Sequence, residues 1–210
     1  MSRAEVPRPQ LRGIGDTPQL RRMTDGSEMS EGHSRSRPPD VWHAPLAELP
    51  PDVAHALHDR GARQLNLYRA LASSPEVVRA WLGFIWSLRD DLVATPRLLR
   101  ELMILRTAVR HASAYEWHHH RVMANELGEE KLAAVADWRE AGVFDDGERT
   151  VLALADAICD GEVPVSLAHE VEQRFGSRGL VELAVTASAY VMVPRVLSAL
   201  GVEIESGEAS

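Results

Sequence analysis

Three ionisable side chains lie where apolar residues are expected on two predicted neighbouring helices. On a helix predicted over 113–128, Glu116 and His120 fall on the apolar face at about 100° per residue. On the preceding predicted helix, over 95–111, Glu101 falls inside the apolar stripe. A carboxylate on a core face is costly unless it is partnered or protonated. Because the connection between the two helices is short, we expect them to pack as antiparallel neighbours that bring the three side chains together.

The three consecutive histidines do not form one cluster, because His118 and His119 point to other faces of the predicted helix. Ser113, at the start of this helix, could donate a hydrogen bond to a ligand. Trp117 could wall a pocket or could equally be a plain core residue. The candidate catalytic residues are Glu101, Glu116 and His120, and the candidate substrate-binding residues are Ser113 and Trp117.

These residue types suit acid–base chemistry near neutral pH. His120 is the natural proton carrier, and two nearby carboxylates, Glu101 and Glu116, tend to hold one proton between them. Other interpretations stay open. Glu116 and His120, four residues apart, could hold a divalent ion together with Glu101. Glu101 could instead pair with a buried arginine or a helix end, and the trio would then be a structural network in a non-catalytic helical oligomer with a binding or scaffolding role.

The rest of the chain is predicted to be helical from residue 41 onward, with no convincing period-2 alternation. The predicted fold is therefore all-α, with one helical domain over 41–205, a disordered tail over 1–40 and a disordered end over 206–210. The expected helices cover about 52–72 with a break near Gly61, 73–88, 95–111, 113–128, 129–138, 145–160, a short segment from Ser166, and 177–200 with a kink at Pro194.

Composition narrows the class of protein. The 210 residues are 45% hydrophobic and 26% charged, with a net charge of −8, which argues against a nucleic-acid partner. We expect no membrane-spanning helix and no signal peptide, and hence a cytoplasmic location. Cys159 is the only cysteine, so an internal disulfide, a Cys-x-x-Cys pair and a thiolate zinc cage are excluded. No glycine-rich phosphate loop is present, which leaves a nucleotide cofactor without support.

The two predicted helices resemble the signature helix pair of the carboxymuconolactone decarboxylase family over RELMILRTAVRHASAYEWHHHRVMANELG (100–128). That family also includes the alkyl hydroperoxidase D-like proteins. Its lead-in helices are similar to NLYRALASSPEVVRAWLGF (66–84), and the C-terminal helix of members with Tyr-Glu-Trp in place of the cysteine pair is similar to YVMVPRVLSALGVE (190–203). In the peroxidase pattern, Glu101 takes the glutamate position, Ser113 and Glu116 take the two cysteine positions, and His120 takes the histidine position.

The resemblance implies a cofactor-independent enzyme and not a thiol peroxidase, because Ser113 and Glu116 supply neither a thiolate nor a resolving thiol. The implied reaction is decarboxylation, or a related lyase or isomerase step, on a small carboxylated lactone or similar unsaturated acid, with no cofactor and no metal. Arg195, in the last predicted helix, is a candidate for binding a substrate carboxylate. The resemblance also implies a homo-oligomer, a trimer or a hexamer, of helical subunits with no nucleic-acid or membrane partner.

Overall fold

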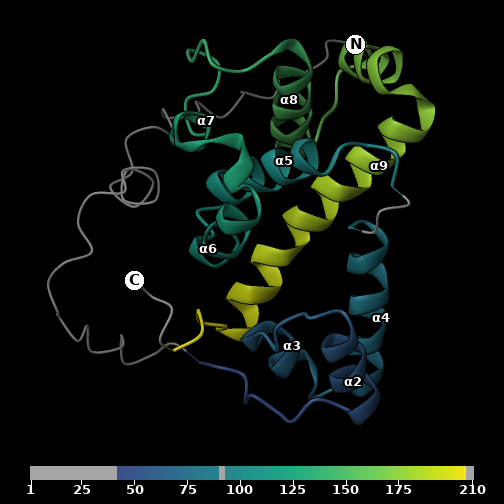
Figure 1. Ribbon diagram of the computed structural model, residues 1–210, viewed down its shortest axis with the longest axis vertical. Coiled ribbons are helices and arrows are strands. Elements are labelled where there is room, and N and C mark those ends of the chain that lie inside the picture. The colour runs from purple at the N-terminus through teal and green to yellow at the C-terminus, as the bar shows by residue number, and fades with distance from the viewer. Residues whose placement is uncertain (1–41, 90–92, 207–210) are drawn as a thin grey trace, which may run out of the picture.

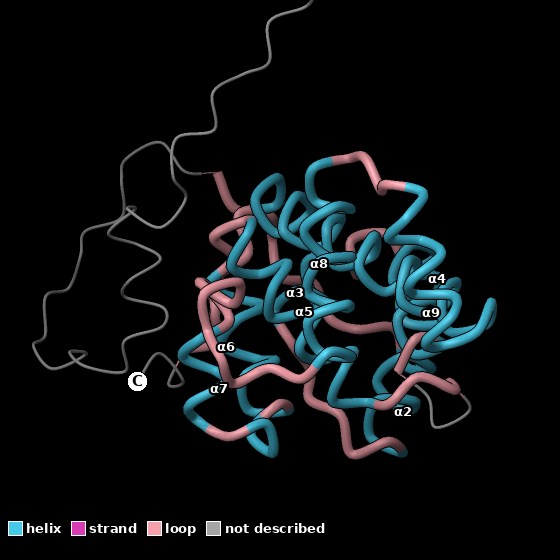
Figure 2. Tube along the Cα trace, turned by 90° about the horizontal axis from the view of Figure 1, so that it is seen from above, coloured by secondary structure: helices cyan, strands magenta, loops and turns pink. Residues whose placement is uncertain are grey.

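The computed structural model describes residues 42–89 and 93–206, and their regular structure is helical with no strand among them (Figures 1 and 2). This confirms the all-α prediction. The elements are α2 (Pro51–Asp59), α3 (Asn66–Leu71), α4 (Pro75–Ser87), α5 (Arg97–Arg110), α6 (Ala114–Met123), the 3₁₀ turn η2 (Asn125–Leu127), α7 (Glu129–Ala134), α8 (Asp146–Asp160) and α9 (Val165–Leu200). The predicted disordered segments, 1–40 and 206–210, lie outside the described residues except for Ser206.

Helix α5 is the central element, because α6, α8 and α9 all pack against it. Ten consecutive residues, from Arg100 to Val109, are buried. Arg100 and Arg106 are among them, although helical spacing places both outside the apolar stripe that contains Glu101. A helix with neighbours on several sides has no solvent face on which to place them.

Two hydrophobic clusters fill the interior and meet along α9, which runs diagonally across the molecule (Figure 1). One cluster joins α5 and α8 with the first part of α9, and it includes Leu105, Leu152 and Leu183. The other joins α2, α3 and α4 with the last part of α9, and it includes Leu57 and Leu82. The α5–α6 pair therefore faces the α3–α4 pair across the middle of the molecule.

Helix boundaries follow local chemistry. A capping box begins α8, since Asp145 Oδ1 accepts from the Glu148 amide at 2.8 Å and Glu148 Oε2 accepts from the Asp145 amide at 2.9 Å. Gly161, with φ of 84°, ends α8 as predicted. The break expected near Gly61 is present, since residues 60–65 separate two helices, α2 and α3, within the predicted 52–72 segment.

In α9 the break lies at Gly176 (φ 73°, ψ 169°) and not at Pro194, around which the torsions stay helical. Only glycine adopts this combination of torsions without strain, so the chain changes direction there. The expectation that no helix could span a membrane needs one correction. Among the described residues, α9 is long and apolar enough to cross one by length and composition alone, a test that the core helix of a soluble protein also passes.

A buried ion network fixes α5 against α8. Asp156 is 2% exposed and accepts hydrogen bonds from Arg106 Nε at 2.6 Å, Arg139 Nη1 at 2.5 Å and Trp138 Nε1 at 3.1 Å. Arg110 Nη1 adds a fourth contact at 3.2 Å. These contacts outweigh the burial that would otherwise raise the pKa of the Asp156 carboxyl, so its pKa lies below the usual value. The network holds in place the helix that carries Glu101.

Candidate active site

Glu101 on α5 and His120 on α6 form a buried pair. The Oε2 atom of Glu101 lies 2.7 Å from Nδ1 of His120, and their side chains are 5% and 8% exposed. The short connection predicted between the helices is present, with Ala112 turning the chain at a φ of 50°. The predicted meeting of these two residues is therefore what the structure shows.

The Glu101 carboxylate holds His120 by Nδ1 and leaves Nε2 free of hydrogen bonds within the described part of the chain. Burial alone would raise the pKa of Glu101. The hydrogen bond with His120, together with the charges of His120, Arg89 and Arg97, outweighs burial, so the pKa lies below its usual value. An ionised Glu101 fixes the orientation of the imidazole ring.

Glu116 is buried without a partner. It is 2% exposed, and neither of its carboxylate oxygens has a hydrogen bond in 42–89 or 93–206. Burial raises its pKa to about 8, and the nearby Ser113 hydroxyl opposes this shift only in part. We expected Glu101 and Glu116 to share a proton, but burial and not Glu101 accounts for the shift. Glu116 is therefore a separate acid that is mostly neutral at pH 7.

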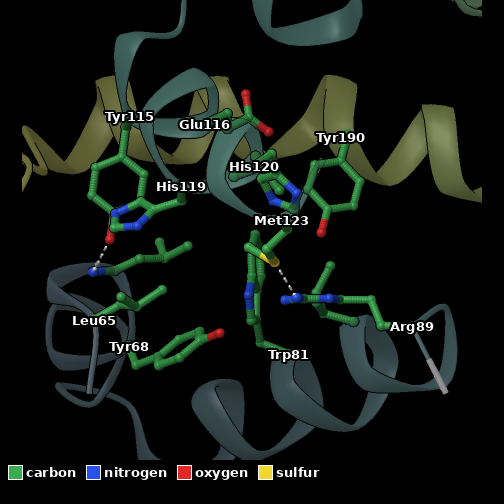
Figure 3. A pocket seen from close by; sticks show the side chains of 13 residues that line it. Leu65, Tyr68, Trp81, Arg89, Tyr115, Glu116, His119, His120, Met123 and Tyr190 are labelled. Atoms are coloured by element: carbon green, nitrogen blue, oxygen red, sulfur yellow. Dashed lines mark hydrogen bonds between the residues drawn. The ribbon is translucent and has the colours of Figure 1, made fainter. Parts of the chain in front are cut away.

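Glu116 and His120 both line a small cavity of about 50 Å³ between α6 and the α3–α4 pair, with α9 as its third wall (Figure 3). The His120 ring meets the Tyr190 ring edge-on, with centroids 4.9 Å apart. A more open hollow of about 440 Å³ adjoins this cavity and shares some of its lining. The cavity is lined by Leu65, Leu67, Tyr68, Trp81, Ile85, Arg89, Tyr115, Glu116, His119, His120, Met123, Tyr190 and Val193.

Neither of the two candidate substrate-binding residues, Ser113 and Trp117, lines the cavity. Ser113 caps α6, where its Oγ accepts from the Glu116 amide at 3.4 Å, and it does not line the cavity. Trp117 lies in the α5–α8 hydrophobic cluster and does not wall the cavity. It lies one helical position after Glu116, so its side chain turns away from the cavity and into the core.

His119 does line the cavity, contrary to the expectation that only His120 among the three histidines would face the site. Its ring lies 4.5 Å from the ring of Tyr115, and its Nε2 lies 3.0 Å from Glu205 Oε2 in the C-terminal segment. The Tyr115 hydroxyl donates to Glu205 Oε1 at 2.9 Å. The cavity therefore covers a wider arc of α6 than one stripe.

Sequence reasoning missed the residues that α3, α4 and α9 bring to the cavity, chiefly Tyr68, Trp81, Arg89 and Tyr190. They are far from the α5–α6 motif in sequence, and their spacing carries no signal of a shared site. Arg195, our candidate for a substrate carboxylate, is exposed, donates to the Val191 carbonyl and lines neither the cavity nor the adjoining hollow. Arg89 is the arginine that reaches the cavity.

Among the described residues, no group of three or more His, Cys, Asp and Glu side chains is arranged to hold a metal ion. The Glu101–His120 contact is a direct hydrogen bond, and Glu116 stands apart from it.

The fold and site define an all-helical protein in which two adjacent helices present a carboxylate–histidine pair to a buried cavity. The model of the carboxymuconolactone decarboxylase family matches residues 75–157, a span that includes α4, α5, α6 and most of α8. Over these residues, the chain is similar to that family. No curated protein matches the chain significantly.

Solved structures share the fold. A peroxidase-related protein from Ralstonia eutropha, described as an alkylhydroperoxidase AhpD core, is 18% identical with a TM-score of 0.69, covering 82% of this chain and 96% of its own. A peroxidase-related protein from Silicibacter sp. is 18% identical with a TM-score of 0.66, covering 83% and 96%. A variant of the debrominase Bmp8, in complex with 2,3,4-tribromopyrrole, is 18% identical with a TM-score of 0.67, covering 80% and 96%. At this identity the likeness is one of fold alone.

Proposed function

We propose that this protein is a cofactor-independent acid–base enzyme that decarboxylates a small carboxylated lactone or a similar unsaturated acid. The observation that carries the proposal is the difference between Glu116, which lines the cavity together with His120, and Glu101, which binds His120 from outside that cavity. Glu101 is ionised and paired with His120, whereas Glu116 is unpartnered and mostly protonated at neutral pH. Pairs of titratable groups held in different protonation states suit acid and base steps in one reaction.

The substrate supplies its own electron sink. The bond between the ring carbon and the leaving carboxylate breaks, carbon dioxide departs, and the electron pair moves through the double bond into the lactone carbonyl. A proton then adds to carbon to give the product. The enzyme has to orient the leaving carboxylate, stabilise the developing oxyanion and deliver that proton.

Each residue has a definite task in this scheme. His120, held at Nδ1 by Glu101, delivers the proton to carbon from Nε2 and regains one from solvent through the adjoining hollow. Glu116, as a neutral carboxylic acid, donates a hydrogen bond to the developing oxyanion. Burial makes this bond strong, because no water competes for the oxyanion there.

The cysteine chemistry of a thiol peroxidase has little support in this chain. Cys159 lies on α8, is half-buried and lines neither the cavity nor the hollow. Burial raises the pKa of its thiol to about 11, so the reactive thiolate is scarce at neutral pH. Solved structures with the same fold bear names of small-molecule enzymes, a debrominase and peroxidase-related proteins, which agrees with an enzyme of small molecules.

The test compares turnover of carboxymuconolactone, followed by carbon dioxide release, in wild type and in His120→Gln, Glu101→Gln and Glu116→Gln. His55→Gln, an exposed histidine on α2, is the matched control. We expect each of the first three variants to lose a factor of about 10² to 10⁴ in rate, the scale of general acid–base catalysis, and to stay folded. His55→Gln should turn over as wild type does.

Two other outcomes decide against the proposal. Equal turnover in wild type and His120→Gln would make the trio a buried structural network and favour a non-catalytic binding or scaffolding protein. Turnover that is lost on chelation and restored by a divalent ion would favour a metal-dependent variant, held by Glu101, Glu116 and His120 after rearrangement.

A further inference from the structure

A second cavity lies on the other side of the Glu101–His120 pair. It has a volume of about 250 Å³, and we call it the arginine pocket after three of its lining residues, Arg89, Arg97 and Arg100. Glu101, Thr186 and Tyr190 also line it. It shares Arg89, Met123 and Tyr190 with the smaller cavity that holds Glu116 and His120. The buried pair thus has a cavity at each end, and we call the three shared residues, Arg89, Met123 and Tyr190, the partition between the cavities.

Positive charge dominates the arginine pocket. Among the described residues that line it, three guanidinium groups face one carboxylate, that of Glu101, which is already paired with His120. Arg97 is engaged by Glu126 and by the Met123 carbonyl. An anion that enters this pocket is therefore attracted by the guanidinium groups, and the pairing of Glu101 with His120 weakens the repulsion between Glu101 and the anion.

Two buried polar groups in this pocket lack the partners that their burial calls for. Arg100 is 5% exposed, yet its only hydrogen bond is from Nη1 to the Thr95 carbonyl at 2.9 Å, and no carboxylate of the described chain lies within ion-pair distance. Thr186 is 1% exposed and its hydroxyl has no hydrogen bond within the described residues. A buried hydroxyl without an acceptor is costly, and a largely buried guanidinium with one hydrogen bond keeps further donors free, so together the two groups point to a ligand that accepts from both.

Arg89 lies between the two cavities, and within the described chain its side chain donates only to a weak acceptor. Its Nη2 lies 2.7 Å from the thioether sulfur of Met123, between the two cavities (Figure 3). A thioether is a poor acceptor for a guanidinium, whereas a carboxylate accepts charge-assisted and often bidentate hydrogen bonds. An arriving carboxylate would therefore draw Arg89 away from Met123 and open the partition.

We propose that the arginine pocket binds a carboxylate group of the substrate, through Arg89, Arg100 and Thr186, and thereby directs the rest of the molecule across the partition toward His120. This inference rests on the proposed function for the identity of the substrate. It also explains why the smaller cavity, at about 50 Å³, can be so narrow: it would receive only the reacting end of the molecule once the partition opens.

The test measures binding without turnover. Maleate, its neutral dimethyl ester and inorganic phosphate are titrated calorimetrically at low ionic strength into wild type, Arg89→Gln, Arg100→Gln, Thr186→Val and the control Arg121→Gln. Arg121 lies on α6, pairs with Glu129 and lines neither cavity, so its variant matches the change of charge. Wild type should bind maleate, and should bind the ester and phosphate far more weakly.

We expect the Kd for maleate to rise at least about 10-fold in Arg89→Gln and Arg100→Gln and about 3- to 5-fold in Thr186→Val, and not to change in Arg121→Gln. If Arg100→Gln does not fold, Arg89→Gln and Thr186→Val test the proposal by themselves. Neither substitution removes a side-chain hydrogen bond to oxygen or nitrogen of the described chain, so both variants should fold. Absence of maleate binding by wild type, unchanged binding in Arg89→Gln and Thr186→Val, or tighter binding of phosphate would each overturn the proposal.

The two proposals fail separately. If maleate binds in an Arg89-dependent manner while no lactone is turned over, the proposed decarboxylation fails and the carboxylate site stands.

Discussion

Replacing Glu116 by glutamine should remove a specific pH dependence from the stability of the fold. Burial raises the pKa of the Glu116 carboxyl to about 8 in the folded protein, from an ordinary value of 4.5 in the unfolded chain. Below pH 4.5 it is protonated in both states and carries no penalty. As the pH rises toward 8, the unfolded chain releases a proton that the folded chain keeps, so the free energy of unfolding falls; above 8 it levels off. The Glu116→Gln variant keeps the shape and a neutral side chain at every pH.

The size of the effect follows from the shift. From 4.5 to about 8 the pKa changes by roughly 3.5 units, which corresponds to a penalty on the order of 4–5 kcal/mol above pH 8. Glu116 is 2% exposed, so solvent screens little of this. For a protein of this length, 1 kcal/mol moves the Tm by about 2–4 °C. We therefore expect the Tm of Glu116→Gln to lie close to that of wild type at pH 5 and roughly 10 °C above it at pH 9.

The assay is thermal unfolding of both proteins between pH 5 and pH 9, followed by far-UV circular dichroism. Contributions from other titrating groups cancel in the difference between variant and wild type. Glu130→Gln, at an exposed position on α7, is the control and should show no growing difference. A difference between Glu116→Gln and wild type that stays constant across this range would refute the conclusion that Glu116 is buried, unpartnered and mostly neutral at pH 7.

Two further variants test the framework and the cysteine. Asp156→Asn should lower the free energy of unfolding by about 3–5 kcal/mol or abolish folding, because it leaves the buried Arg106 and its neighbours without their counter-charge. Asp160→Asn, at a half-exposed carboxylate, should lower it by at most about 1 kcal/mol. Chemical denaturation of both variants measures these free energies. Similar losses in the two would contradict the role given to the Asp156 network. Cys159→Ser should leave turnover of carboxymuconolactone within about 2-fold of wild type, since the thiol lies outside the cavities. If wild type instead reduces peroxides with a thiol reductant and this variant does not, the protein is a thiol peroxidase.

The sequence by itself determined the fold class and the central pair of the site. Apolar residues at helical spacing predict helices through the described chain, and the capping box at Asp145 and the glycine at 161 fix the limits of α8. The pairing of Glu101 with His120 was also predictable, because a short connection leaves two amphipathic helices little choice but to face each other. These features depend on local periodicity and on neighbours in the chain.

Tertiary structure alone decided how the carboxylates differ and what surrounds them. Helical spacing places Glu101 and Glu116 on facing stripes, but it cannot show that one gains an imidazole partner while the other is left in an apolar environment. Trp81, Arg89, Arg100 and Tyr190 come from helices whose positions depend on packing around α5 and α9. Their contribution depends on contacts between segments far apart in the chain, and one-dimensional periodicity carries no information about such contacts. The pKa of Glu116 and the charge of the arginine pocket are properties of that three-dimensional surrounding, because desolvation and Coulomb energy depend on distances in space.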